Sequence, residues 1–266
     1  MTGNVILESR DVGKRFGSFQ AVEGVNYRVC EGESVGIIGP NGAGKTTFFN
    51  LLTGMFRPSS GSIHYRGQDV SGLSGDRRTA LGLVRTFQLV SVFNTLPVID
   101  NLVLAVLRGK PGLVSRCGFL FGRRRPKAVL AACEAALDRV GIDPLVWDQP
   151  TANLSYGNKR KLEIAMALAL RPAVLLLDEP LAGLSDYEIN EVRDLLHQVK
   201  RDFTLVIIEH KISRILDLVS RLSVMHEGHL IAEGPVETIL ADPTVRLVYW
   251  GEQQAEPAAA NAEGSP

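Results

Sequence analysis

The spacing of apolar residues predicts short strands in the first part of the chain. Residues 5–9, 25–29, 34–38 and 61–65 are short, largely apolar or alternating runs, separated by turns that carry glycine. Runs of this length bounded by glycine are typical of β-strands, because an extended backbone places successive side chains on opposite faces. We therefore expect this part of the chain to be mainly β-structure.

The middle of the chain has the spacing of helices. Residues 98–107 contain no helix-breaking residue, and residues 127–140 carry alanine and leucine at helical spacing. Between them, residues 108–126 are rich in glycine, proline and arginine, which predicts a loop or an interrupted helix.

The pattern of a parallel sheet appears in the last part of the chain. Residues 174–177 and 205–208 are continuous apolar runs, as in strands that are buried on both faces. An amphipathic helix is expected at 186–201, and a hairpin at 222–225 and 230–232. This order of elements predicts an α/β domain with a mostly parallel sheet, into which the helical middle is inserted.

Composition limits the class of protein. A length of 266 residues can bury a substantial core, and a formal net charge of zero gives no reason to expect a nucleic acid as partner. Cys30, Cys117 and Cys133 are scattered and are expected to be buried or free thiols of a reducing compartment. The chain has no signal-peptide pattern and no run of about eighteen apolar residues, so we expect a soluble, cytoplasmic protein. The tail at 252–266, rich in alanine, glutamate, glutamine and proline, is expected to be disordered.

A glycine-rich motif follows the predicted strand at 34–38. It fits G-x-x-x-x-G-K-[ST] and consists of Gly39, Pro40, Asn41, Gly42, Ala43, Gly44, Lys45 and Thr46, with Thr47 next to it. The glycines allow the backbone to aim several N–H groups at one point, and the helix expected at 46–52 adds the positive end of its dipole. Lys45 is placed to reach the β- and γ-phosphates, and the Thr46 hydroxyl to bind Mg²⁺. The motif, a P-loop, therefore predicts a site for a nucleoside triphosphate.

Two adjacent carboxylates follow the apolar strand at 174–177. Asp178 and Glu179 stand at its C-terminal end, which is the edge where ligands bind in parallel sheets. Asp178 is placed to hold Mg²⁺, directly or through water, and Glu179 to orient or deprotonate an attacking water.

A third pattern lies just before these carboxylates. Residues 153–158 read Asn-Leu-Ser-Tyr-Gly-Asn and precede a helical run at 159–170. By themselves, a serine and a glycine before a helix predict no more than an N-cap and a turn.

Together the three patterns resemble the nucleotide-binding subunits of ATP-binding cassette (ABC) transporters, in which the third motif reads L-S-G-G-Q. Leu154, Ser155 and Gly157 match that motif, whereas Tyr156 and Asn158 replace a glycine and the glutamine. The resemblance implies that Ser155 and Gly157 contact the γ-phosphate of an ATP held by a second subunit. The N-terminus of a helix is suited to such a contact.

Further residues match positions of this family, and each has an alternative interpretation. Gln88 matches the glutamine that senses Mg²⁺ and water, His210 the histidine that contacts the γ-phosphate, and Phe16 the aromatic that stacks on adenine. From the residues alone, Gln88 and His210 are polar residues at strand ends, and Phe16 is a core side chain. Ser185 stands where the family has an aspartate, and Asp186 lies one position further on. Whether this chain makes the hydrogen bond that the family's aspartate makes across the subunit interface is therefore left open.

The resemblance covers nearly all of residues 4–251 and implies an ABC ATPase fold. That fold has a P-loop core, an N-terminal antiparallel β-subdomain and a helical subdomain near 89–170. ATP and Mg²⁺ are the implied cofactors, with Glu179, His210 and Gln88 as catalytic residues; Thr46, Gln88 and Asp178 are the implied metal ligands. The implied location is peripheral, on the cytoplasmic side of the inner membrane. The implied partners are a second, different ATPase subunit, two transmembrane permease subunits reached through the surface beside Gln88, and indirectly a solute-binding protein.

Several features resemble the importers of branched-chain amino acids and related amides. They are the tyrosine variant at 154–157 followed by residues 161–165, the extra stretch between 107 and 128, and the ending at 248–252. The longer of the two ATPase subunits in that branch has such an insertion. Residues 183–186 are slightly more similar to the corresponding residues of the urea importers, which are close relatives of this branch.

Other classes stay open as alternatives. They are the ATPases of lipopolysaccharide exporters, which lack the insertion, soluble ABC ATPases without a transport role, and plain P-loop kinases, which would not need His210 or the third pattern. The transported substrate is set by other subunits. The basic cluster at 123–127 is either a solvated loop or a contact with anionic lipid headgroups or an acidic loop of a membrane partner.

Overall fold

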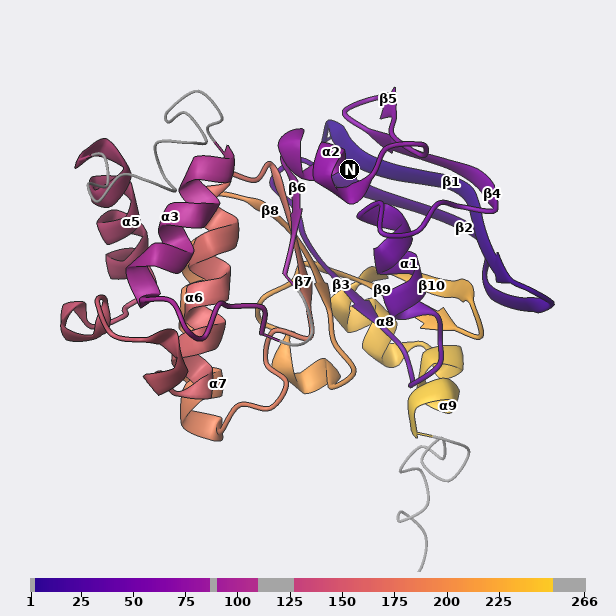
Figure 1. The fold of residues 1–266 in the computed structure, drawn as a ribbon. Coiled ribbons are helices and arrows are strands. Elements are labelled where there is room, and N and C mark those ends of the chain that lie inside the picture. The colour runs from indigo at the N-terminus through magenta and orange to yellow at the C-terminus, as the bar shows by residue number, and fades with distance from the viewer. Residues whose placement is uncertain (1–2, 87–89, 110–126, 251–266) are drawn as a thin grey trace, which may run out of the picture.

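The computed structural model describes residues 3–86, 90–109 and 127–250, which form two sheets with helices around them (Figure 1). The predicted α/β architecture is confirmed. An N-terminal sheet is antiparallel, a second sheet is mostly parallel, and a group of helices is inserted between two strands of the second sheet. Gln88, the cluster at 123–126 and the tail at 252–266 lie outside the described residues.

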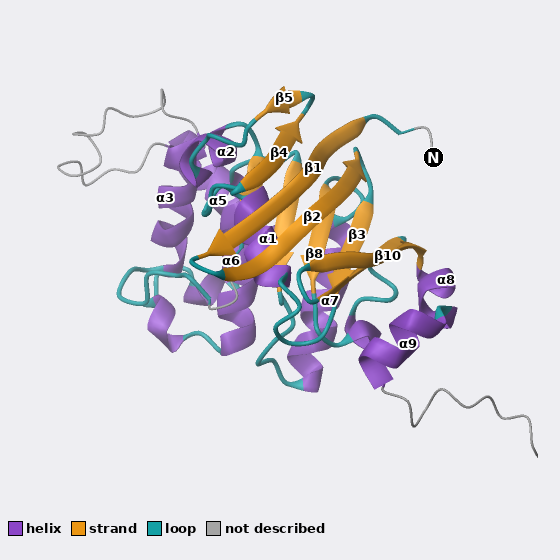
Figure 2. Cartoon of the chain, turned by 90° about the vertical axis from the view of Figure 1, so that its right-hand side faces the viewer, coloured by secondary structure: helices purple, strands orange, loops and turns teal. Residues whose placement is uncertain are grey.

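The antiparallel sheet, in front in Figure 2, has the strand order β2-β1-β4-β5. Its strands are β1 (Val5–Phe16), β2 (Phe19–Cys30), β4 (Ser60–Tyr65) and β5 (Gln68–Asp69). The strand predicted at 5–9 was too short. β1 continues to Phe16 through irregularities in its pairing with β2. This second half of the strand contains exposed charged residues, so it lacks the apolar pattern from which a strand is predicted.

The second sheet has the strand order β10-β9-β3-β8-β7-β6 and is parallel except for β10. Its strands are β3 (Ser34–Ile38), β6 (Leu83–Arg85), β7 (Val174–Asp178), β8 (Thr204–Ile208), β9 (Arg221–His226) and β10 (His229–Pro235). Along β7, Val174 and Leu176 pack into the core under the antiparallel sheet, whereas Leu175 and Leu177 pack into the core under the helices. This explains the continuous apolar run, because both faces of the strand are buried.

Three of the helices pack on one another beside the parallel sheet. They are α3 (Val98–Gly109), α5 (Lys127–Arg139) and α6 (Tyr156–Ala169). The other α-helices among the described residues are α1 (Lys45–Leu52), α2 (Gly75–Ala80), α7 (Asp186–Val199), α8 (Val236–Ala241) and α9 (Pro243–Trp250). None of the helices in the described part of the chain is long and apolar enough to cross a membrane.

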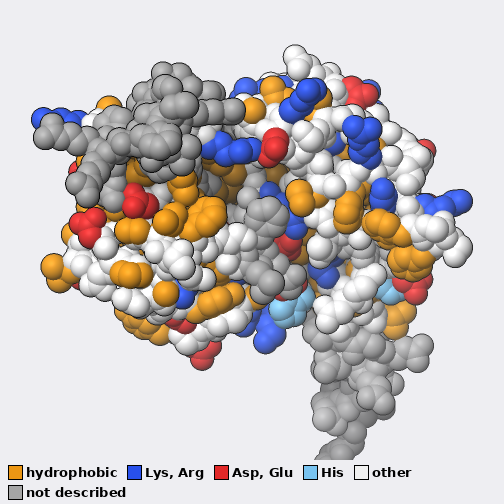
Figure 3. Space-filling model, in the orientation of Figure 1, with side chains coloured by type: hydrophobic (Ala, Val, Ile, Leu, Met, Phe, Trp, Pro, Cys, Tyr) orange, Lys and Arg blue, Asp and Glu red, His pale blue; other side chains and the backbone are white. Residues whose placement is uncertain are grey.

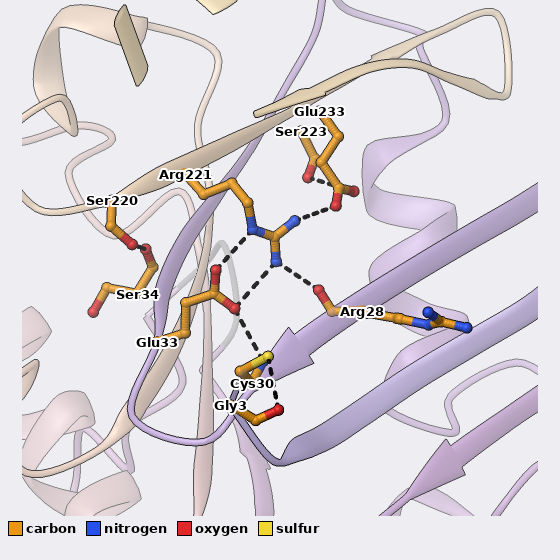
Figure 4. Close-up of polar contacts among 9 residues, drawn as sticks. All are labelled: Gly3, Arg28, Cys30, Glu33, Ser34, Ser220, Arg221, Ser223 and Glu233. Carbon is orange, nitrogen blue, oxygen red and sulfur yellow. Dashed lines mark hydrogen bonds and ion pairs between the residues drawn. The ribbon is translucent and has the colours of Figure 1, made fainter. Parts of the chain in front are cut away.

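A buried arginine joins the two sheets next to β3 (Figure 4). Arg221 of β9 donates from Nε to Glu33 Oε1 at 2.7 Å and from Nη2 to the Arg28 carbonyl oxygen of β2 at 2.5 Å. Its Nη1 lies 2.5 Å from Glu233 of β10. One guanidinium group therefore holds the start of β3 against strands of both sheets, because its fork of donors can serve several acceptors at once.

Candidate functional site

The residues predicted to carry chemistry meet at the carboxyl edge of the parallel sheet. Strands β3, β8 and β7 are neighbours in that order. The P-loop, residues 39–47, follows β3, Glu179 follows β7, and His210 lies just after β8. Because parallel strands direct their carboxyl ends to one edge, these segments lie together although they are far apart in the sequence.

The P-loop is packed so tightly that two of its glycines have no room for a side chain. A Cβ atom at Gly39 would lie 2.2 Å from the Met225 carbonyl oxygen. Gly44 has a φ of 95°, and a Cβ atom there would lie 2.7 Å from the Ala21 carbonyl oxygen. The loop is thus held against β2 and β9 in a conformation that glycine alone adopts without strain.

Lys45 is positioned within the loop. Its Nζ donates to the carbonyl oxygens of Gly39 at 2.7 Å and Pro40 at 2.9 Å. Burial lowers the pKa of Lys45, and the nearby carboxylates of Glu179 and Asp178 oppose that shift. The ammonium therefore lies on the loop carbonyls, within electrostatic reach of the two carboxylates, at the start of α1, where the first helical amides have no partner within the helix.

A buried ion pair holds Asp178. The Arg85 Nη2 lies 2.5 Å from Asp178 Oδ2, and the two side chains are 8% and 2% exposed. Arg85 Nη1 also donates to Asn50 Oδ1 of α1 at 2.5 Å. Arg85 thereby connects the helix after the P-loop with the carboxylate at the end of β7. The sequence analysis did not identify Arg85, because its partners are far away in the chain.

Arg85→Met is expected to destabilise the protein, because it leaves the buried Asp178 carboxylate without its cation. We expect the free energy of unfolding to fall by about 3 kcal/mol. Urea denaturation of the purified chain measures this value. The matched control is Arg108→Met, which removes an exposed ion pair with Asp76 and should cost less than about 1 kcal/mol. Equal losses in the two variants would contradict the role assigned to Arg85.

Glu179 and His210 lie next to each other at this edge. Glu179 Oε2 is 3.8 Å from His210 Nδ1, and the Glu179 side chain is 17% exposed. Glu179 has a φ of 45°, and its amide donates to the Ile208 carbonyl oxygen at 3.0 Å. A left-handed backbone is strained for glutamate, and such strain is common where a side chain has to be aimed at a reacting group.

Glu209 is a further acid at this edge that the sequence analysis left without a role. Its side chain is fully buried, and Oε2 lies 3.7 Å from His210 Nδ1. Burial raises the pKa of Glu209; Arg214 opposes this rise and Glu179 adds to it. Helix α9 also reaches this point. Burial raises the pKa of Tyr249 in that helix, the Gly39 backbone opposes the rise, and the Glu209 carboxylate adds to it.

The raised pKa of Glu209 predicts a pH-dependent cost in stability. The folded state keeps the proton above the ordinary pKa of glutamate, whereas the unfolded state releases it, so the free energy of unfolding falls as the pH rises through that window. Glu209→Gln removes this dependence and should stabilise the protein by about 1 kcal/mol at about pH 8, with a smaller gain at about pH 5.

Thermal unfolding at the two pH values measures this effect. The control Glu134→Gln changes an exposed glutamate of α5. A gain for Glu209→Gln that grows as the pH falls would mean that Glu209 is not held protonated by burial.

Ser155 and its neighbours form the signature segment, defined here as residues 154–158. The Ser155 hydroxyl oxygen accepts a hydrogen bond from the Asn158 amide at 3.2 Å, so Ser155 is the N-cap of α6. The Tyr156 ring lies against Gly183, where a Cβ atom would be 3.2 Å from Tyr156 Cε1. Helices α6 and α1 lie on opposite sides of the parallel sheet (Figure 1), so the sheet separates this segment from the P-loop of the same chain.

Phe16 is 44% exposed at the end of β1, and its ring contacts Phe56 edge-on at a centroid distance of 5.4 Å. This exposure is not that of a core side chain, and it leaves ring surface open to a planar ligand. Figure 3 shows basic, acidic and apolar side chains interspersed over the face seen in Figure 1, without one large basic patch.

Residues 22–182 match the ABC transporter family. The high-affinity branched-chain amino acid transport ATP-binding protein LivG of Escherichia coli K12 is 38% identical over 253 residues, which cover 93% of this chain and 98% of LivG. BraF of Pseudomonas aeruginosa, a protein with the same description, is 35% identical over 254 residues, with the same coverage of each chain.

Solved structures agree with these sequence similarities. A nucleotide-free ATP-binding cassette from an ABC transporter matches with a TM-score of 0.79 and 29% identity, over 93% of this chain and all of that chain (100%). The ADP conformation of such a cassette matches with a TM-score of 0.78 and 28% identity, over 93% and 99% of the two chains. Both comparisons therefore extend over the two sheets and the inserted helices.

Proposed function

The chain belongs to the ABC transporter family, and we propose that it is the ATPase subunit of an importer for branched-chain amino acids or related small amino acids and amides. The meeting of the P-loop, Glu179 and His210 at one sheet edge supports ATP hydrolysis. Similarity to LivG and BraF along nearly their whole lengths supports the substrate class. We assign the chain to the longer of the two ATPase subunits of such an importer.

In the proposed reaction, each residue at the sheet edge acts on the γ-phosphate or on the attacking water. Lys45 moves from the loop carbonyls to the phosphates and neutralises their charge in the transition state. Glu179 orients the water and takes its proton, and His210, beside it, contacts the γ-phosphate. The P-loop amides bind the phosphates, and Phe16 stacks on the adenine.

The residues of the site fit a bound Mg²⁺. Mg²⁺ is commonly held by one or two carboxylates together with substrate phosphates and water. Asp178 provides a carboxylate that Arg85 orients, and the exposed Thr46 provides a hydroxyl at the start of α1. Gln88 is the third proposed ligand. When bound, the ion supplies positive charge to the phosphate oxygens.

We propose that the site is completed by a second, different ATPase subunit. The signature segment is separated from its own P-loop by the parallel sheet, so it is free to serve the nucleotide of a partner in a head-to-tail pair. In that arrangement Ser155 and Gly157 contact the partner's γ-phosphate, and the partner's equivalent segment covers the P-loop described here.

Two permease subunits are the proposed membrane partners, and through them the chain lies at the cytoplasmic side of the membrane. A groove of about 490 Å³ lies between the end of α1, α2, β6 and the ends of α3 and α6. Met55, Val84, Arg85 and Arg108 line it. Val84 and Arg85 stand shortly before Gln88 in the chain, and the exposed Met55 and Arg108 offer the groove an apolar and a cationic side chain. We place the permease contact in this groove.

Uptake by the assembled transporter tests this function. The complex is purified through this chain from its own membranes and reconstituted into lipid vesicles with ATP inside and its solute-binding protein outside. The proposal predicts ATP-dependent uptake of leucine, isoleucine or valine. Uptake of urea alone would assign the chain to the urea importers, and recovery of the chain without any membrane protein would favour a soluble ABC ATPase.

A further inference from the structure

One carboxylate connects the signature segment with the loop that follows Glu179. Glu188 lies in the first turn of α7, and its Oε2 accepts hydrogen bonds from the Ser185 amide at 3.1 Å and the Ser185 hydroxyl at 2.9 Å. Its Oε1 accepts a hydrogen bond from the Gly157 amide at 2.8 Å. The contact with the Ser185 amide is one half of the capping box of α7, and the other half is the bond from the Glu188 amide to the Ser185 hydroxyl oxygen. The contact with Gly157 instead reaches across to α6.

Glu188 also covers Gly157. The glycine is buried, and a Cβ atom there would lie 2.7 Å from both Cγ and Oε1 of Glu188. The Gly157 backbone is thus shielded by the Glu188 side chain in the structure described here. A phosphate group cannot reach the Gly157 amide unless Glu188 moves.

The carboxylate occupies the position that an anion would take at the start of α6. A helix N-terminus attracts negative charge because its first amides lack partners within the helix. Hydrogen bonds from Ser185 and Gly157 hold the pKa of Glu188 below its ordinary range, so the side chain is ionised at neutral pH. An ionised carboxylate and a phosphate repel each other, and the Gly157 amide has a single hydrogen to donate.

We propose that Glu188 is a positioning residue that sets the ATP concentration at which the composite site closes. The γ-phosphate held by the partner subunit must displace the Glu188 carboxylate from the Gly157 amide before the signature segment can bind it. The inference rests on the composite site proposed above. Glu188 can make this movement without unfolding α7, because the Ser185 hydroxyl oxygen still caps the helix by accepting from the Glu188 backbone amide.

The variant that isolates this effect is Glu188→Gln. Glutamine also suits this position of a capping box, so α7 keeps its cap. It loses the negative charge. Because its amide has one acceptor oxygen where the carboxylate has two, a glutamine that keeps the Ser185 contact holds the Gly157 amide no more strongly than a neutral hydrogen bond does. The control is Glu191→Gln, which removes a charge from the same helix and a contact with α6, the 3.5 Å pair with Lys161, without touching Gly157.

The quantity measured is ATP-driven closure of the two ATPase subunits in the full complex. Energy transfer between two fluorophores, one on each subunit, reports this closure. All variants carry Glu179→Gln so that ATP is bound without being hydrolysed. With Glu188→Gln we expect half-maximal closure at an ATP concentration about fivefold lower, from the difference between a charged and a neutral hydrogen bond. With Glu191→Gln we expect a change of less than about twofold.

Each other outcome has a defined meaning. Closure at the same ATP concentration with and without Glu188→Gln would overturn the inference and leave the composite site standing. Closure that needs more ATP with Glu188→Gln would overturn it as well, because the carboxylate would then support the signature segment. The absence of ATP-driven closure in the Glu179→Gln complex with Glu188 intact would contradict the composite site itself.

Discussion

Glu179→Gln is expected to lower ATP hydrolysis by the assembled transporter by about 100-fold or more, while ATP still binds. Glutamine keeps the size and the hydrogen-bonding capacity of the side chain but cannot accept a proton from the attacking water. The effect should be large because Glu179 is aimed at the edge of the sheet by a strained backbone and lies beside His210. Steady-state ATPase rates at saturating ATP measure the loss.

The matched control for Glu179→Gln is Glu227→Gln. Glu227 also has a left-handed backbone, with a φ of 45°, but it lies in the turn between β9 and β10 and has no proposed role in hydrolysis. Its variant should keep the full rate. If Glu179→Gln retained a rate within about threefold of the unmodified protein, Glu179 would not be the base.

Lys45→Ala is expected to weaken ATP binding by at least about tenfold and to lower turnover by about 100-fold or more. The ammonium neutralises charge on the bound phosphates and on the transition state, so both quantities should fall together. The variant also removes the two hydrogen bonds to the Gly39 and Pro40 carbonyl oxygens, which help to hold the loop. Calorimetric titration of the isolated chain with ATP measures the affinity.

Lys200→Ala is the control for the lysine variant. Lys200 caps α7 and donates to the Asp217 carbonyl oxygen, away from the P-loop, so ATP binding should be unchanged. A Lys45→Ala protein that melts at the normal temperature and binds ATP with unchanged affinity would show that Lys45 does not face the phosphates.

The sequence predicted the elements whose signal is local. The continuous apolar runs of β7 and β8 are visible because both faces of each strand are buried, and the P-loop is visible because its residues are consecutive. The helices α2, α8 and α9 and the bounds of the short strand β6 were not predicted, since these elements are too short to show a clear period.

The parts of the site that were missed depend on contacts between distant segments. Arg85 acts through Asp178, which is 93 positions away, and Glu188 acts through Gly157, which is 31 positions away. Nothing in the local sequence distinguishes Arg85 from a surface arginine or Glu188 from an ordinary capping residue. Likewise, the burial of Glu209 follows from the packing around β8 and is not visible in the sequence.

The central claim is that this chain hydrolyses ATP at a site that a second ATPase subunit completes. The most direct test is the ATPase rate of the purified chain, measured alone and then with its partner ATPase and permease subunits. The account predicts that the isolated chain binds ATP and is mainly monomeric and weakly active, and that assembly raises the rate by about tenfold or more. Full activity of the single monomeric chain, with no further increase on assembly, would contradict the claim.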